Sequence, residues 1–67
     1  MKKTIGEIVK AIRSHGEKIY LASAYPSIFQ IEMRKGGYTS EDPEYSFVSQ
    51  QVAAAVNAFR RRARRES

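Results

Sequence analysis

The sequence contains no cysteine and no tryptophan, and it has only one histidine and two prolines among its 67 residues. Without cysteine the chain cannot form a disulfide, a thiolate metal site or a cysteine nucleophile. Long apolar runs are missing as well, since no segment approaches the roughly 20 apolar residues of a membrane span. We therefore predict a cytoplasmic protein with no membrane contact and no secretory signal.

A constellation of catalytic or ligating residues is also missing. His15 is the only histidine, and it follows a predicted helix, where an imidazole suits the negative end of the helix dipole. Glu41, Asp42 and Glu44 lack the spacing of a calcium-binding loop and better suit the start of a helix. We therefore predict a protein that is not an enzyme and that holds no cofactor or metal.

Positive charge is concentrated at one end of the chain. Residues 1–59 carry seven Lys or Arg and six Asp or Glu, whereas residues 60–67 carry five Arg and one Glu. Such a basic segment favours an anionic partner, and the planar guanidinium suits phosphate particularly well. The predicted phosphate-binding residues of this segment are Arg60, Arg61, Arg62, Arg64 and Arg65.

The longest predicted element is a C-terminal helix from about Tyr45 to Arg64. Asp42 can cap it, and Pro43 suits a first helical turn. Acidic residues near its start and arginines at its end both match the helix dipole. Apolar residues at helical spacing form one stripe, which comprises Val48, Val52, Ala55, Val56 and Phe59.

A second helix is predicted over Thr4–Ser14. Thr4 and Glu7 have the spacing of a capping box, in which each side chain bonds the other residue's backbone N–H. Gly16 follows as a left-handed C-cap. The apolar stripe comprises Ile5, Ile8, Val9 and Ile12.

The middle of the chain is predicted to form a short antiparallel sheet. Strands are expected over residues 18–24 and 28–34, with a tight turn at Gly36-Gly37 and a short third strand over 38–40. The second strand rests on the alternation of Phe29, Ile31 and Met33 with polar residues. The alternative is an all-α chain with a helix-turn-helix look, in which Pro26 lies in the first turn of a helix that ends near Gly36.

We therefore predict one small α+β domain over residues 1–67, in which two helices pack on the sheet in the order α-β-β(-β)-α. So short a chain has a marginal core, and so small a sheet leaves open edges, so a homodimer is an alternative to a monomer. The predicted core comprises Ile5, Ile8, Val9, Ile12, Ile19, Leu21, Phe29, Ile31, Met33, Val48, Val52, Val56 and Phe59.

The leading functional hypothesis is a small accessory or regulatory protein that binds DNA or RNA through phosphate contacts. Lys18, Arg34 and Lys35 on the predicted hairpin would assist the C-terminal arginines. The alternative is a protein-interaction module or small inhibitor, which would dock on a protein partner through its sheet face. The tyrosines expected at that interface are Tyr20, Tyr25 and Tyr38.

Overall fold

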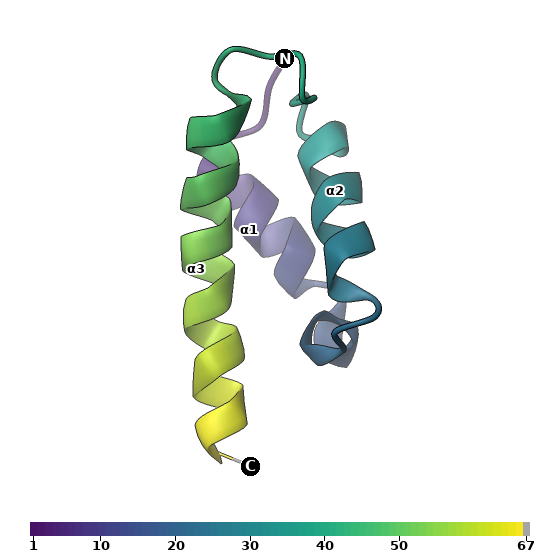
Figure 1. The fold of residues 1–67 in the computed structure, drawn as a ribbon, viewed down its shortest axis with the longest axis vertical. Helices are drawn as coiled ribbons and strands as arrows, with labels where there is room; N and C mark the ends of the chain where they lie inside the picture. Colours follow the sequence, from purple (N-terminus) through teal and green to yellow (C-terminus); the bar gives the residue numbers. More distant parts are fainter. Residues whose placement is uncertain (67) are drawn as a thin grey trace.

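The computed structural model describes the backbone of residues 1–66 and the side chains of residues 1–62. Its elements, in order, are helix α1 (Ile5–Arg13), the 3-10 helix η1 (Gly16–Tyr20), helix α2 (Tyr25–Lys35) and helix α3 (Tyr45–Glu66). In Figure 1, α3 runs down the long axis, α2 runs in the opposite direction beside it, and α1 lies behind both. No strand occurs among the described residues, so the predicted α+β fold is wrong and the all-helical alternative holds.

Helix α1 begins with the predicted capping box. The Glu7 N–H donates to Thr4 Oγ1 at 3.1 Å, and the Thr4 N–H donates to Glu7 Oε1 at 2.9 Å. These hydrogen bonds satisfy backbone donors that a helix start leaves without intrahelical partners. Gly16 has the left-handed φ of 68° that its place in the sequence predicts, but it lies two residues beyond the C-cap Ser14.

Both predicted strands of the middle third are helical instead. Residues 18–24 form the end of η1 and a turn, and residues 28–34 lie within α2. Pro26 lies in the first turn of α2, where its missing N–H costs no intrahelical hydrogen bond. The third predicted strand, residues 38–40, belongs to the loop between α2 and α3.

Of the alternating residues that predicted the second strand, Met33 is buried and Phe29 is half-buried, but Ile31 lies outside the buried face. Ile28, at 7% exposed, faces the core, whereas Ile31 is 47% exposed. The buried face of this segment includes the polar residue Glu32. With Glu32 counted, the buried positions have the helical spacing i, i+3, i+4, i+7, i+8. Its buried and half-buried members are Tyr25, Ile28, Phe29, Glu32 and Met33.

The glycine pair ends α2 instead of making a hairpin turn. A Cβ on Gly36 would lie 2.8 Å from Ile8 Cδ1, so any larger residue there would force the buried Ile8 side chain to shift where α2 approaches α1. Gly37 has φ of +93°, a conformation that other residues rarely adopt. The pair therefore reverses the chain towards the loop before α3.

Helix α1 is the centre of the packing. It contacts both α3 and α2, and it makes smaller contacts with η1. Leu21, at 54% exposed, and Ile31 do not belong to the core, contrary to the sequence prediction. Ile28 belongs to the core although the sequence analysis did not include it. The buried apolar residues are Ile8, Ile12, Ile19, Ile28, Met33, Val48, Val52 and Val56.

Candidate functional site

The basic end of α3, which we define as Arg60, Arg61 and Arg62, is the first candidate site. Helix α3 has 22 residues, and at a rise of 1.5 Å per residue it is about 33 Å long. Its last turns extend past the other elements (Figure 1). Arg61 and Arg62 are exposed on it. The side chains of Arg64 and Arg65 lie outside the described residues.

Arg60 differs from its two neighbours because it is part of the packing. Its guanidinium carbon lies 3.8 Å from the centre of the Tyr25 ring, and Nη1 donates to Asn57 Oδ1 at 3.4 Å. Burial raises the pKa of the Tyr25 hydroxyl, and the charge of Arg60 opposes that rise. Arg60 thus ties the end of α3 to the start of α2.

Arg13 adds a cation to the basic end that the sequence analysis did not select. It lies in the last turn of α1, and its guanidinium carbon is 5.4 Å from the centre of the Phe59 ring in α3. Because Phe59 directly precedes Arg60, the exposed Arg13 lies beside the basic end. Its position in the sequence indicates only a dipole-matched helix end, and packing alone brings it to α3.

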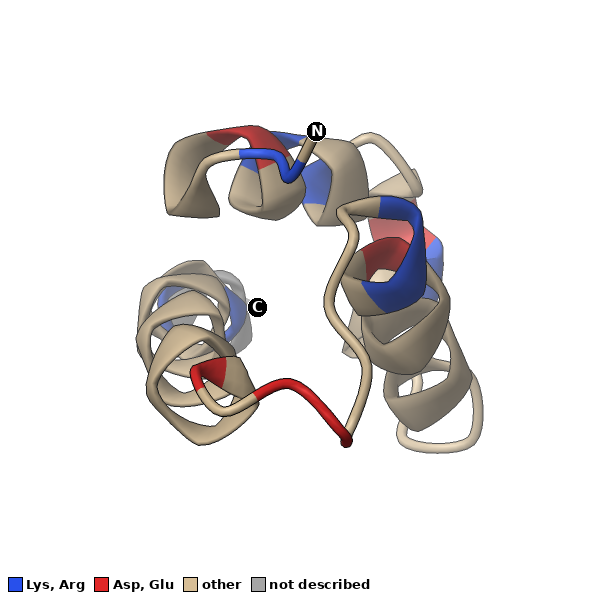
Figure 2. Ribbon diagram, turned by 90° about the horizontal axis from the view of Figure 1, so that it is seen from above, with Lys and Arg blue, Asp and Glu red and all other residues tan. Residues whose placement is uncertain are grey.

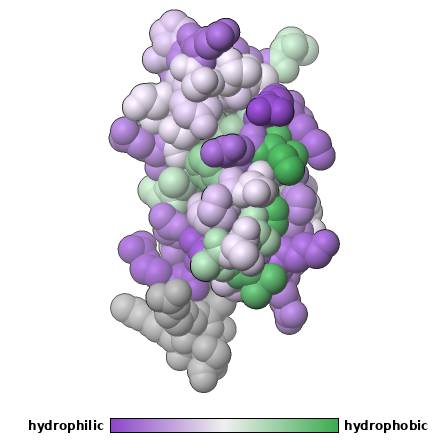
Figure 3. All heavy atoms as spheres, turned by 45° about the vertical axis from the view of Figure 1, so that its right-hand side comes forward, coloured by the Kyte–Doolittle hydropathy of each residue, from purple (hydrophilic) through white to green (hydrophobic). Residues whose placement is uncertain are grey.

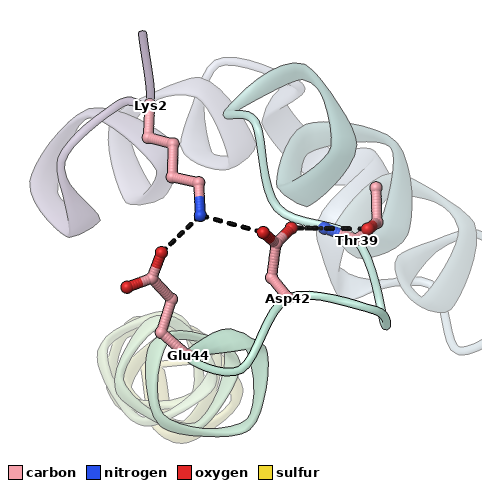
Figure 4. A network of polar contacts seen from close by, with 4 residues as sticks. All are labelled: Lys2, Thr39, Asp42 and Glu44. Carbon is pink, nitrogen blue, oxygen red and sulfur yellow. Dashed lines mark hydrogen bonds and ion pairs between the residues drawn. The ribbon is translucent and has the colours of Figure 1, made fainter.

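Glu41, Asp42 and Glu44 lie in the loop that joins α2 to α3, at the end of the molecule opposite the basic end (Figure 1). Seen from above in Figure 2, this loop carries red positions and lies near blue Lys and Arg positions. Figure 4 shows Lys2 Nζ donating to Asp42 Oδ1 at 3.0 Å and to a Glu44 carboxylate oxygen. The Asp42 carboxylate also accepts from the Thr39 N–H at 2.8 Å. This carboxylate therefore holds the α2–α3 loop, whereas the sequence predicted a helix cap.

The hydrogen bonds of this network shift two pKa values. The Thr39 N–H and then Lys2 hold the pKa of Asp42 below its usual range. Glu44 and then Asp42 raise the pKa of Lys2. The N-terminal segment is fixed further by its backbone, because the Lys3 N–H donates to the Gly36 carbonyl at 2.9 Å.

The other predicted phosphate-binding residues do not join the basic end. Arg34 and Lys35 are exposed in the last turn of α2, near the acidic loop and far from the end of α3 (Figure 1). Lys18 is exposed in η1. The predicted hairpin that would have carried all three does not exist.

The three predicted tyrosines do not form one patch. Tyr20 is 44% exposed in η1, and Tyr25 lies beneath Arg60. Tyr38 is half-buried at the other end of the molecule, with Lys2 Nζ 4.7 Å from its ring centre. The sheet face that was to present them is absent, but Tyr25 and Tyr38 both line a groove between α2 and α3.

A groove between α2 and α3 is the second candidate site. Its larger part has a volume of about 440 Å³ and continues into a part of about 230 Å³, with Gln30 and Tyr45 common to both. We call this the α2–α3 groove. Its lining comprises Tyr25, Pro26, Phe29, Gln30, Arg34, Tyr38, Thr39, Ser40, Tyr45, Ser49, Gln50, Ala53 and Asn57.

The single histidine has a structural partner that the sequence analysis missed. His15 Nε2 lies 2.6 Å from Glu32 Oε2, and the Glu32 side chain is only 7% exposed. The pair joins the end of α1 to the buried face of α2. Its spacing of 17 residues has no local signal, so only the packing of the two helices reveals it.

Metal and membrane sites receive no support from the described part of the chain. No group of three or more His, Asp or Glu side chains is placed there to hold a metal ion. None of the helices described combines the length and apolar character needed to cross a bilayer. Figure 3 shows the hydrophobic side chains on one face of the molecule as separate spots among polar ones. Leu21 and Ile31 are among the exposed hydrophobic residues.

Comparison with known proteins returned no match among protein-family models, curated proteins or solved structures. Function is therefore argued from the geometry of the basic end and of the α2–α3 groove.

Proposed function

We propose that this protein is a non-enzymatic nucleic-acid-binding factor that contacts phosphates through the basic end of α3. The observation that carries the proposal is the exposure of Arg61 and Arg62 on a helix end that extends past the rest of the fold. Arginine forms two parallel hydrogen bonds to phosphate, which makes it well suited to a nucleic-acid backbone.

The distribution of charge supports the same site. Among the described residues, the recorded ion pairs involve Lys2 and His15, and none involves an arginine. The loop with Glu41, Asp42 and Glu44 lies at the other end of the molecule, so it does not repel an anion at the basic end (Figure 1). Arg13 supplies a further cation beside Phe59. Arg60 stacks on Tyr25, so Arg61 and Arg62 are the main phosphate contacts of the proposal.

The test is binding of labelled duplex DNA and RNA, measured by fluorescence anisotropy over a range of salt concentrations. We expect affinity to fall steeply with salt, because phosphate contacts release counterions. In the double variant Arg61→Gln/Arg62→Gln, log K should fall less steeply with log salt. The magnitude of the slope should decrease by about 2, since each lost DNA phosphate contact removes about 0.9.

The matched control is Arg34→Gln/Lys35→Gln, which removes the same charge from the far end of the molecule. We expect this control to keep the slope of the parent protein within about 0.5, because each contact contributes about 0.9. Equal losses in the two variants would mean that net charge alone drives binding. No loss in the Arg61→Gln/Arg62→Gln variant would refute the proposed site.

A further inference from the structure

The α2–α3 groove has the shape of a helix-binding site. Its two walls are helices, and α1 packs against both of them from behind, so the front of the groove is open (Figure 1). From Tyr25 to Arg34 the groove follows ten residues of α2, a rise of about 14 Å or two and a half turns of helix. This length accommodates side chains that an opposing helix presents at i, i+3 or i+4, and i+7.

The middle of the groove is apolar and aromatic. Tyr25 and Phe29 line it from α2, with ring centres 6.0 Å apart in an edge-on arrangement. Tyr45 and Ala53 line it from α3, and the small Ala53 leaves room between the helices. Rigid aromatic rings around a concave apolar surface are typical of sites that anchor a few large side chains of a partner.

The polar part of the lining is neutral or cationic. Gln30, Ser49, Gln50 and Asn57 supply amide and hydroxyl groups along the rim of the larger part. Arg34 lines the other end, and no Asp or Glu is among the described residues that line either part. An acidic partner would meet Arg34 at this end of the groove and Arg60, which stacks on the lining Tyr25, at the other. The Asp42 carboxylate lies against Thr39 at the Arg34 end, so the acidic side chains of the partner are expected to face the two arginines.

The backbone around the groove points to the same kind of partner. Both walls are helical, so their backbone hydrogen bonds are made within each helix and no strand edge is open to an added strand. A helix satisfies its own backbone groups and offers side chains alone. It therefore suits a groove whose contacts come from side chains.

We infer that the α2–α3 groove binds an amphipathic helix of a partner protein that is apolar on one face and acidic beside it. This site lies outside the basic end of α3 and does not depend on the proposed nucleic-acid binding. The partner helix would pack into the groove opposite α1 and convert the three-helix arrangement into a four-helix one.

The probe is a synthetic helical peptide of about 15 residues, with leucines at i, i+4, i+7 and i+11 and glutamates beside them. A second peptide carries lysine in place of each glutamate. Titration of the ¹⁵N-labelled protein at near-physiological salt should shift the amide signals of Phe29, Tyr45 and Ala53 with the glutamate peptide. The lysine peptide should bind at least about tenfold more weakly, which corresponds to about 1.4 kcal/mol.

Two neighbouring alanines provide a matched pair of variants. Ala53 lines the groove, whereas Ala54 is exposed and does not line it. Ala53→Glu should weaken the glutamate peptide at least about tenfold, as loss of a central interface contact does, because it places both bulk and negative charge in the groove. Ala54→Glu should leave the affinity within about twofold of the parent value, as expected for a surface change.

Variants at two neighbouring glutamines provide a second test that should not disturb folding, since both side chains are exposed. Gln50 lines the groove and Gln51 does not. Gln50→Glu changes charge with almost no change of size, so it should weaken the glutamate peptide by a clear factor while Gln51→Glu does not. Circular dichroism and thermal unfolding of all four variants verify that each is folded.

Several results would overturn the inference. Equal binding of the two peptides would mean that charge does not select the partner. Amide shifts that map to the basic end of α3 would place the peptide outside the groove. Sedimentation of the protein alone tests a second copy as the occupant, since a dimer that Ala53→Glu dissociates would show the groove to be filled by another copy of this chain.

Discussion

At the scale of single residues, we expect stability to be most sensitive to substitution at the contact of His15 with Glu32. The Glu32 side chain is 7% exposed, and the imidazole is its recorded side-chain partner among the described residues. A buried polar group without a hydrogen-bond partner keeps its desolvation cost and loses the compensation. The pair therefore joins α2 to α1, and loss of one partner should cost more than replacement of both by apolar groups.

We predict that His15→Ala lowers the free energy of unfolding by about 1–3 kcal/mol, the cost of an unsatisfied buried group. Urea unfolding followed by circular dichroism measures this change. The double variant His15→Ala/Glu32→Leu should recover part of the loss, because it removes the unpaired carboxylate as well. A double variant as unstable as the sum of the two single variants would show that the residues act independently.

At the scale of elements, α1 and α3 were predicted from sequence, whereas α2 was given only by the all-α alternative. The capping box of Thr4 and Glu7 and the apolar stripes of α1 and α3 are local signals. In α2 one position of the stripe is a glutamate whose partner lies 17 residues away. The alternation of Phe29, Ile31 and Met33 therefore favoured a strand, although Ile31 lies outside the packed face that Phe29 and Met33 share.

We predict opposite outcomes for two isoleucines that the sequence analysis had placed together in the core. Ile12 is fully buried and Ile31 is 47% exposed. Ile12→Val should lower the free energy of unfolding by about 0.5–1.5 kcal/mol. Ile31→Val should change it by no more than about 0.5 kcal/mol. Chemical denaturation measures both, and equal costs would contradict the orientation of α2.

At the scale of the whole molecule, two charged features lie at opposite ends. Lys2, Asp42 and Glu44 join the start of the chain to the loop before α3, while Arg61 and Arg62 lie at the far end (Figure 1, Figure 4). The concentration of arginines in sequence predicted part of the basic end. The contribution of Arg13 and the lining of the α2–α3 groove depend on how the helices pack, so sequence pattern could not reveal them.

Three charged groups with shifted pKa values, Asp42, Glu7 and Lys2, make the stability of the fold depend on pH. The pKa of Asp42 is lowered from an ordinary 3.8 and that of Glu7 from 4.5. Their contributions are therefore present above those values and are lost as the pH falls through the lower values of the folded protein. The pKa of Lys2 is raised from 10.5, so its contribution is present below that value and is lost as the pH rises above it.

We therefore predict that acid weakens the parent protein more than it weakens Asp42→Asn. The variant lacks the carboxylate that accepts from Thr39 and pairs with Lys2, so the loss between pH 5 and pH 2, the range over which such carboxylates protonate, should be smaller. Urea midpoints at a series of pH values measure the difference, with Glu41→Gln as the control at an exposed neighbouring acid. Parallel pH curves for all three proteins would contradict the assignment.

The central place of α1 has a consequence for the order in which the fold forms during synthesis. Helix α1 is made before α3, yet α3 is one of its main packing partners. The apolar faces of α1 and α2 can pair early, but Val52 and Val56 reach the core only after α3 has left the ribosome. Until then part of the α1 stripe stays exposed to water and to chaperones. The core is therefore complete only once α3 has been made.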